Sequence, residues 1–403
     1  MPELFIARQP IYNRTQHVYG YELVYRPPEH EALKVSSTST DVSKVMLNAV
    51  TEIGLENLVG GRCAFVNLPR DFLVGQFSLP LVADRVAIEI PENLVVDDEL
   101  ISGLKWLRRQ GYTLALDHFS YSEAVVPVLD LVHIVKLDMQ ALGEEKLRAH
   151  VHTLKEYPRL KLLAEKIEIP EEYEVCLELG IDYFQGYFFS RPKVIRRTRL
   201  PTNQLALMQL LAEVQSPDAT IPKLESLISQ DVGLTYKLLR YINSAFFGMP
   251  KPVQSIQKAV VFLGTKVIQK WVSLLVLARV EDKPVELMIT AVVRAKMCEI
   301  LAKAVRYKAE DTCFTVGLLS VLEALLDLPM EKVLGMLTLS DDVNRALLHY
   351  EGVPGELLEV VLHYEFGEWD QLQYPELEEE LILDAYLQAI AWATEACRNL
   401  LGD

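Results

Sequence analysis

The chain has 403 residues, of which 50% are hydrophobic and 24% charged, a composition typical of a soluble globular protein long enough for two domains. Its formal net charge of -16 repels polyanions, which argues against nonspecific adhesion to nucleic acid or anionic membranes. The five cysteines are scattered and include no CxxC pair, so we expect neither a disulfide framework nor a zinc knuckle.

The N-terminal segment MPELFIARQP has no basic stretch leading into an apolar one, so it is not expected to be a signal peptide. The most apolar stretch, residues 260–280, is interrupted by Lys266 and Lys270. This favours a buried helix over a membrane span. We therefore expect a cytoplasmic protein without a membrane span.

Short apolar runs rich in Val, Ile and Phe recur up to about residue 200, most of them separated by helix-like segments. The runs are residues 4–12, 18–26, 63–69, 85–90, 113–119, 133–138, 160–167 and 183–189. Repeated alternation of strand and helix predicts either a parallel α/β barrel or a doubly wound sheet.

Polar residues lie at or near the C-terminal ends of these runs: Glu22, Asn67, Glu89, Asp117, Lys136 or Asp138, Glu165 and Gln185. Any one of them could be an ordinary strand end in solvent. In a closed barrel, however, all seven would meet at one mouth. Because most are acids and amides, they predict a shared site for a hard cation such as Mg²⁺, Mn²⁺ or Ca²⁺.

The sequence changes character after the basic connector around Arg196, Arg197 and Arg199. The remaining residues have almost entirely helical periodicity, which predicts a helical bundle of about two hundred residues. We therefore place a barrel domain at residues 1–195 and a helical domain at residues 196–403.

Eight short motifs of the first half occur together in a specific order and spacing: QPI at 9–11, GYELVYR at 20–26, FVN at 65–67, IE at 88–89, DHF at 117–119, VKLD at 135–138, AEKIE at 164–168 and DYFQGY at 182–187. With them the first half resembles the EAL domain over most of residues 1–195. Active members of that family hydrolyse the bacterial second messenger cyclic di-GMP. The resemblance implies an α/β barrel of the TIM-like, EAL type.

The resemblance also implies roles for individual residues. Glu22, Asn67, Glu89 and Asp117 would hold one metal ion, Lys136 would orient the attacking water, and Glu165 would act as general base. Gln9 and Arg26 would lie near the phosphate of the ligand, and Gln185 would also lie near the ligand. Such a set suits phosphodiester hydrolysis, which needs a water to be placed and deprotonated while negative charge develops.

Three departures from the family pattern predict weak or absent turnover. His118 replaces an Asp that holds the second metal in the family, so a carboxylate oxygen becomes an imidazole nitrogen. The segment FSYSEAVVPV lacks the glycine-rich loop of active members, and Lys166 replaces the glycine of AEGVE. We therefore expect one Mg²⁺ or Mn²⁺ ion rather than two. For His118 itself, a hydrogen bond to Asp117 or a vestigial position is favoured over metal ligation.

The second half resembles the HDOD domain, an all-α relative of the HD phosphohydrolases, through LPTNQLALMQLL, SLISQDVGLTYKLLRYINSAFFG and VQSIQKAVVFLG. Active HD proteins need several histidines and a His-Asp pair. No histidine lies between His152 and His349, and the expected GLLHD reads GLLSV at 317–321. The resemblance therefore implies a metal-free bundle that contacts a protein partner.

These features leave three functions open. The first is a bacterial signal transduction protein whose degenerate EAL barrel senses cyclic di-GMP or docks a partner, with the HDOD domain as output. The second is an active metal-dependent phosphodiesterase that gives linear pGpG. The third is an interaction platform without nucleotide. A homodimer is compatible with all three, and DNA is not expected as a ligand.

Overall fold

A computed structural model describes residues 5–26, 43, 46–47, 50–92, 94–186, 202–216, 218–244, 246–249, 252–280, 283–337, 339–372, 374 and 376–401. The chain divides into two compact units. Unit 1 is Met1–Phe189 with Glu365–Gly367, and unit 2 is Ser190–Tyr364 with Glu368–Asp403. Within the described ranges, no helix combines the length and apolar character needed to cross a membrane.

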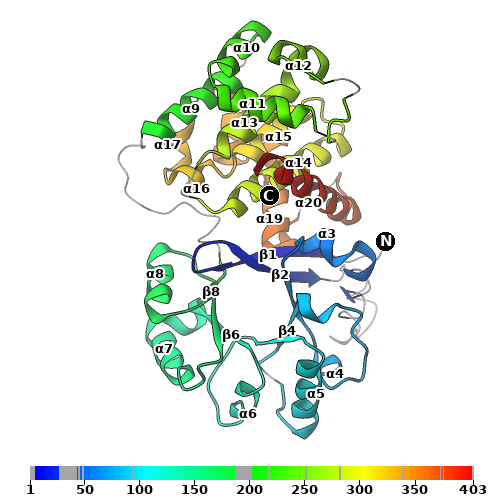
Figure 1. Ribbon diagram of the computed structural model, residues 1–403, viewed down its shortest axis with the longest axis vertical. Coiled ribbons are helices and arrows are strands. Elements are labelled where there is room, and N and C mark those ends of the chain that lie inside the picture. Colours follow the sequence, from blue (N-terminus) through cyan, green and yellow to red (C-terminus); the bar gives the residue numbers. More distant parts are fainter. Residues whose placement is uncertain are drawn as a thin grey trace. The chain divides into compact units, whose positions relative to one another are not determined.

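The described strands of unit 1 close into a barrel in sequence order (Figure 1). They are β1 (Phe5–Asn13), β2 (Val18–Arg26), β3 (Cys63–Asn67), β4 (Val86–Ile90), β5 (Thr113–Leu116), β6 (Ile134–Asp138), β7 (Lys161–Glu165) and β8 (Tyr183–Phe184). The predicted α/β barrel is confirmed, and the doubly wound alternative is wrong.

The barrel is not wholly parallel, which corrects the sequence prediction. From β2 to β8 neighbouring strands run parallel, but β1 is antiparallel to both β2 and β8. The reason is the short turn between β1 and β2, in which the amide of Asn13 donates to the carbonyl of His17 over 2.9 Å. So short a connection can join only antiparallel strands.

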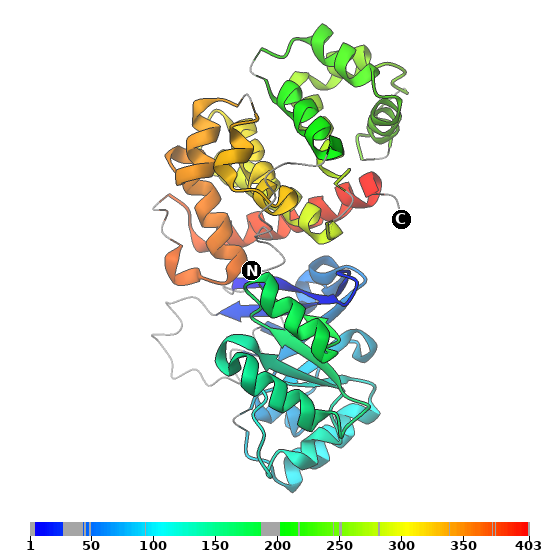
Figure 2. The ribbon, with the colours of Figure 1, turned by 90° about the vertical axis from the view of Figure 1, so that its left-hand side faces the viewer.

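Helices connect the parallel strands and lie on the outside of the barrel (Figures 1 and 2). They are α3 (Leu55–Val59), α4 (Arg70–Leu73), α5 (Asp98–Arg109), α6 (Val126–Leu129), α7 (Met139–Leu154) and α8 (Pro170–Leu179). Helix α5 illustrates how the sequence determines such a helix. The Asp97 side chain caps its N-terminus by accepting a hydrogen bond from the amide of Leu100, and Leu100, Leu104 and Leu107 form one buried face.

An apolar layer fills the interior of the barrel. Its buried members come from six strands: Ile11, Phe65, Ala87, Ala115, Ile134 and Leu163. Tyr19 and Tyr183 pack against this layer, and their rings stack at 4.2 Å between centroids. The interior at this level is therefore a packed core, as in other small barrels.

Unit 2 is helical in its described part. Its helices are α9 (Thr202–Gln215), α10 (Ile221–Ser229), α11 (Val232–Ile242), α12 (Ile256–Leu263), α13 (Thr265–Leu277), α14 (Val285–Ala304), α15 (Glu310–Leu319), α16 (Leu322–Leu326), α17 (Met330–Leu334), α18 (Asp341–His349), α19 (Gly352–Phe366) and α20 (Glu379–Leu401). The predicted helical bundle is confirmed.

The most apolar stretch forms two helices rather than one, because Gly264 has φ 84° and ends α12 before α13 begins. Helix α13 is buried over most of its length. One of its residues, Trp271, packs in an aromatic cluster with Tyr241, Phe246, Phe247 and Trp392.

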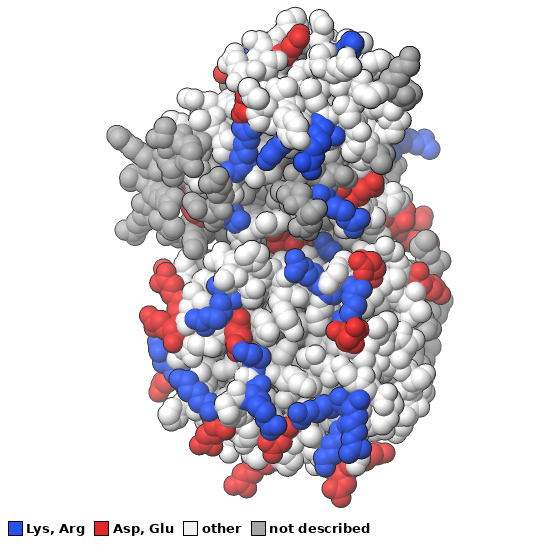
Figure 3. Space-filling model, viewed as in Figure 1, with Lys and Arg blue, Asp and Glu red and all other residues white. Residues whose placement is uncertain are grey.

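On the face shown in Figure 3, Lys and Arg side chains are interspersed with Asp and Glu.

Candidate functional site

A polar layer lies directly above the apolar layer, because side chains on a strand alternate between its two faces. Asn67 follows Phe65 by two positions, and Lys136 follows Ile134 by two. The same spacing places the remaining inward-facing polar residues, which gives a layer of Glu22, Asn67, Glu89, Asp117, Lys136, Glu165 and Gln185. Glu22 and Lys136 lie in the middle of their strands, and the others lie at or near the carboxyl ends. Binding groups gather at this end of α/β barrels.

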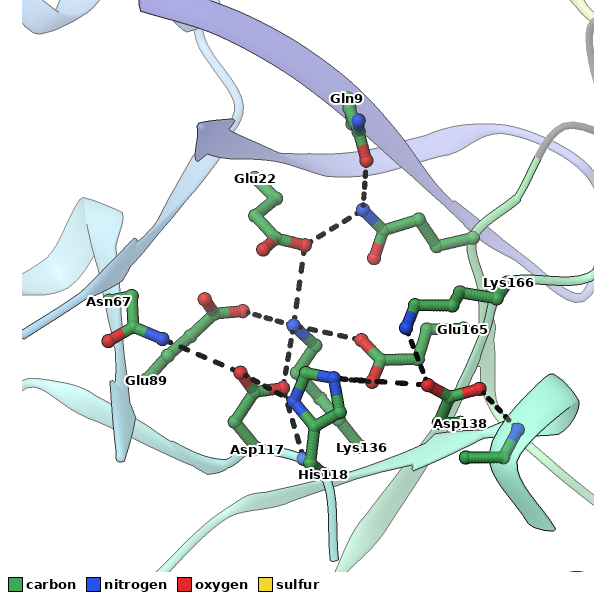
Figure 4. Close-up of polar contacts among 12 residues, drawn as sticks. Gln9, Glu22, Asn67, Glu89, Asp117, His118, Lys136, Asp138, Glu165 and Lys166 are labelled. Atoms are coloured by element: carbon green, nitrogen blue, oxygen red, sulfur yellow. Dashed lines mark hydrogen bonds and ion pairs between the residues drawn. The ribbon is translucent and has the colours of Figure 1, made fainter. Parts of the chain in front are cut away.

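Lys136 is at the centre of the polar layer (Figure 4). Its ammonium nitrogen lies 2.8 Å from Oε1 of Glu89, 3.0 Å from Oδ1 of Asp117, 3.1 Å from Oε2 of Glu165 and 3.3 Å from Oε2 of Glu22. One buried ammonium therefore holds together four carboxylates that come from four different strands or strand ends.

Burial and charge act in opposite directions on these groups. Burial raises the pKa of Glu89 well above its ordinary value, and the neighbouring Glu22 adds to this effect while Lys136 opposes it. Burial alone would lower the pKa of Lys136, but the surrounding carboxylates, Glu22 foremost, raise it. The surrounding carboxylates thus favour the charged form of Lys136.

His118 extends this network towards solvent. Its Nδ1 lies 3.1 Å from Oδ2 of Asp117, and its Nε2 lies 3.7 Å from Oε1 of Glu165. The hydrogen bond to Asp117 raises the pKa of His118 to about 9, against the effect of partial burial. Burial would raise the pKa of Asp117, but His118 and Lys136 bring it down to about 2. This geometry favours the interpretation of His118 as a hydrogen-bond partner of Asp117.

Asp138 and Lys166 form a second ion pair at the same mouth, with 2.7 Å between Nζ of Lys166 and Oδ2 of Asp138. The other oxygen of Asp138 accepts from the amide of Ala141 and caps α7. Although burial acts against it, the hydrogen bond from Lys166 lowers the pKa of Asp138. The sequence identified Lys166 as a departure from the family pattern but gave no sign of its partner.

The amides of the site connect to the carboxylates. Nε2 of Gln185 donates to Oε2 of Glu22 over 2.8 Å and to Oε1 of Gln9 over 3.2 Å. Nδ2 of Asn67 donates to Oδ2 of Asp117 over 3.5 Å. The structure therefore joins the predicted site residues into one network, with one exception. The side chain of Arg26, at the end of β2, lies outside the described residues.

Several oxygens in this network have capacity for a cation. Oε2 of Glu89 and Oε1 of Glu165 are buried and accept no hydrogen bond from any described residue. Ligand atoms of Asp117, His118 and Glu165 lie within 4.8 Å of one another, close enough to share a metal ion. Carboxylate oxygens of this kind are suited to Mg²⁺ or Mn²⁺.

The mouth contains more acidic than basic side chains. Lys136, Lys166 and protonated His118 supply three positive charges. The carboxylates in contact with them are Glu22, Glu89, Asp117, Asp138 and Glu165. The acidic groups of the mouth thus outnumber its basic groups, while burial raises the pKa of Glu89 and Glu165 and so favours their neutral forms.

The segment of unit 2 where the sequence lacks a His-Asp pair is a packed helix end. Oγ of Ser320 donates to the carbonyl of Gly317 over 2.8 Å and lies 3.3 Å from Nη1 of Arg294. Leu318, Leu319 and Val321 are buried. Among the described residues, the metal-compatible group found is the one in the barrel.

Comparison with known families finds one family in the first half of the chain and another in part of the second half. The EAL domain matches residues 2–192, and the HDOD domain matches residues 200–332. The chain is 33% identical to the Cyclic di-GMP phosphodiesterase CdgJ of Vibrio cholerae serotype O1 (strain ATCC 39315 / El Tor Inaba N16961) over 378 residues, which are 93% of this chain and 88% of the relative.

Two further similarities were found. The protein YuxH of Bacillus subtilis (strain 168) is 30% identical over 409 residues, covering 99% of each chain. A calcium and cyclic di-GMP complex of Klebsiella pneumoniae BlrP1 is similar in structure, with a TM-score of 0.39, 22% identity, and coverage of 47% of this chain and 56% of that chain.

Proposed function

Because the chain belongs to the family of EAL–HDOD proteins, we propose that it is a bacterial signal transduction protein whose barrel binds cyclic di-GMP together with one divalent cation. Hydrolysis at this site is weak or absent. The helical unit passes the signal on through contact with a protein partner. The observation that carries the proposal is the intact oxygen layer around Lys136 beside a mouth partly occupied by His118 and Lys166.

The residues of the polar layer fit one bound ion. Glu22, Asn67, Glu89 and Asp117 would hold it, and Oε2 of Glu89 is a buried acceptor with no hydrogen bond among the described residues. When bound, the ion supplies positive charge to the phosphodiester and to an adjacent water. Mg²⁺ and Mn²⁺ are both suited to this set of oxygens.

The chain's own side chains then orient the ligand. Gln9 and Gln185, already joined by a hydrogen bond, present amide groups at the rim where a nucleotide phosphate or base edge would lie. Lys136 keeps the carboxylates together and neutralises part of their charge. Glu165 has a buried oxygen and a pKa that burial raises, which suits a group that accepts a proton.

A second candidate function is phosphodiesterase activity that gives linear pGpG. It is supported by the position of Glu165 beside Lys136 and by the name of the relative CdgJ. It is disfavoured by His118, which brings a protonated imidazole to Asp117 where a carboxylate would attract a second cation. The two candidates differ in whether product forms, so a single sample can separate them.

The test is calorimetric titration of the full-length protein with cyclic di-GMP in Mg²⁺, in Mn²⁺ and in EDTA, followed by chromatography of the same samples. We expect micromolar or tighter binding that weakens at least tenfold in EDTA and in Glu22→Ala, with little pGpG after long incubation. Glu145→Ala, at an exposed residue of α7 outside the polar layer, is the control. Stoichiometric conversion to pGpG within minutes would establish the second candidate, and absence of binding would overturn both.

A further inference from the structure

The backbone of Lys166 adopts a conformation that ordinary residues rarely use. Lys166 directly follows β7 and has φ 56°, in the left-handed region that favours glycine. A lysine held there needs support from its surroundings. The structure supplies that support from two segments next to β7, the start of α7 and the end of β8.

The first support comes from the start of α7, where Nε2 of Gln140 donates to the carbonyl of Lys166 over 3.2 Å. The second comes from the end of β8, where the carbonyl of Gln185 accepts from the amide of Ile167 over 3.1 Å. Next to it, a Cβ on Gly186 would come within 2.2 Å of the Ile167 carbonyl oxygen, so the two segments pack closely. The surrounding structure thus fixes the direction in which the Lys166 side chain leaves the backbone.

That direction leads to Asp138, as Figure 4 shows. The Asp138 side chain is almost fully buried, while that of Lys166 is 56% exposed, so the ammonium covers a buried carboxylate from the solvent side. One oxygen of Asp138 caps α7 and the other binds Lys166. Both oxygens are therefore engaged before any cation arrives.

The Asp138 carboxylate, which Lys166 covers, lies next to the predicted metal site. Nε2 of His118 lies 3.9 Å from Oδ2 of Asp138 and 3.7 Å from Oε1 of Glu165. A second divalent ion at the position of this imidazole nitrogen would face Oδ2 of Asp138 as well as Oε1 of Glu165. It would have to displace the Lys166 ammonium, and two cations so close together repel each other strongly.

We propose that Lys166 is a built-in cation that takes the place of a second divalent ion by binding Asp138, so that the barrel mouth loads one metal ion. This inference deepens the proposed function and rests on it. It makes Lys166, which directly follows the expected general base Glu165, a determinant of how many ions bind. This role is in addition to that of the replacement at His118. The ammonium also keeps positive charge at the rim, where the phosphates of a dinucleotide would approach.

The chain offers a matched control for this role. Lys161, at the other end of β7, forms an ion pair of the same length, 2.7 Å, with Asp182, and its side chain is 57% exposed. It lies at the start of the strand, away from the polar layer. Lys161→Met and Lys166→Met therefore remove the same charge and the same type of contact at the two ends of one strand.

The test counts Mn²⁺ ions bound per chain by electron paramagnetic resonance of the full-length protein without nucleotide. We expect one ion in the wild type and in Lys161→Met, and a second ion in Lys166→Met whose affinity is at least tenfold higher than any second binding in the wild type. Melting temperatures give a second readout: Lys166→Met should melt lower in EDTA and gain more than the wild type on adding Mn²⁺.

Lys166→Gly separates charge from backbone conformation, since it removes both the ammonium and the left-handed lysine. Two bound ions in both Lys166→Gly and Lys166→Met support the role of the charge. One ion in both variants, a second ion in the glycine variant alone, or two ions already in the wild type would overturn it. Cyclic di-GMP titration of the wild type is read separately: absence of nucleotide binding to the wild type, with the expected ion counts in the variants, rejects the proposed function and leaves this inference standing.

Discussion

The ammonium of Lys136 and the carboxylate of Glu89 lie 2.8 Å apart, and their side chains are 1% and 0% exposed. Two charges this deeply buried are costly unless each compensates the other. In this barrel one ammonium faces several carboxyl groups, because Lys136 contacts three further carboxylates besides Glu89. The polar layer is therefore held together by one cation and is poised to take up another.

Removing that cation should destabilise the barrel. We expect Lys136→Met to lower the free energy of unfolding in EDTA by about 3 kcal/mol, since it leaves buried carboxylates facing one another. A divalent ion should recover part of this loss, because it supplies the missing charge. Urea unfolding with and without Mg²⁺ measures both effects.

The comparison variant is again Lys161→Met, whose partially exposed ion pair is expected to contribute less than about 1 kcal/mol. If Lys136→Met were no less stable than Lys161→Met in EDTA, the carboxylates would have to be protonated in the wild type. The account of the layer as a cage around a cation would then be wrong.

Restoring a carboxylate at position 118 tests why turnover is expected to be weak. His118→Asp exchanges a cation beside Asp117 for an anion, which should favour a second ion and raise pGpG formation in Mn²⁺ by about tenfold or more. The control is the same substitution, His152→Asp, at an exposed position of α7. An unchanged rate in His118→Asp would place the lesion elsewhere, for instance at Lys166.

The sequence predicted the barrel and the register of its polar residues well, because both follow from local patterns. Phe65 and Asn67, or Leu163 and Glu165, are two positions apart on one strand, so an apolar layer and a polar layer can be read from alternation alone. The direction of β1 could not be read in this way, since alternation is the same in parallel and antiparallel strands. It depends on the turn at Asn13.

The ion pairs of the site were harder to foresee. Lys166 and Asp138 lie 28 positions apart, and their contact requires both the closure of the barrel and the left-handed conformation of Lys166. The arrangement of four carboxylates around Lys136 is likewise a property of the closed barrel. Sequence motifs identified the participants, but their pairing is determined by three-dimensional proximity.

In unit 2, close contact between α14 and α15 depends on Gly317. A Cβ at this position would lie 2.6 Å from the carbonyl oxygen of Arg294 and 2.7 Å from the backbone of Ala295. Gly317→Ala should therefore push the helices apart and lower the free energy of unfolding by about 2 kcal/mol. Fluorescence of Trp271 and Trp392 during urea unfolding reports the change, since both belong to the aromatic cluster of this unit.

Gly335→Ala is the matched glycine substitution. Gly335 has φ −63°, and its nearest neighbour to an added Cβ is 3.4 Å away, so the change should be neutral or stabilise by up to about 1 kcal/mol. Equal stability of the two variants would contradict the close contact between α14 and α15.

Glu299 makes the stability of unit 2 dependent on pH. Its carboxylate lies 2.8 Å from Nζ of Lys270 and 2.7 Å from Nζ of Lys296. Burial alone would raise the pKa of Glu299, but the two lysines lower it from 4.5 to about 2. A carboxyl whose pKa is lower in the folded state stabilises that state above the unfolded pKa, and this contribution is lost as the pH falls towards the folded pKa.

Glu299→Gln should therefore cost most at neutral pH and progressively less in acid. The difference in unfolding free energy between wild type and variant should shrink by about 1 kcal/mol between pH 7 and pH 3.5, where the unfolded carboxyl is already protonated. Urea unfolding followed by tryptophan fluorescence at both pH values measures it. Glu213→Gln, at an exposed position of α9, controls for general acid effects. A difference for Glu299→Gln that is independent of pH would show that the two lysines do not hold this carboxyl in its charged form.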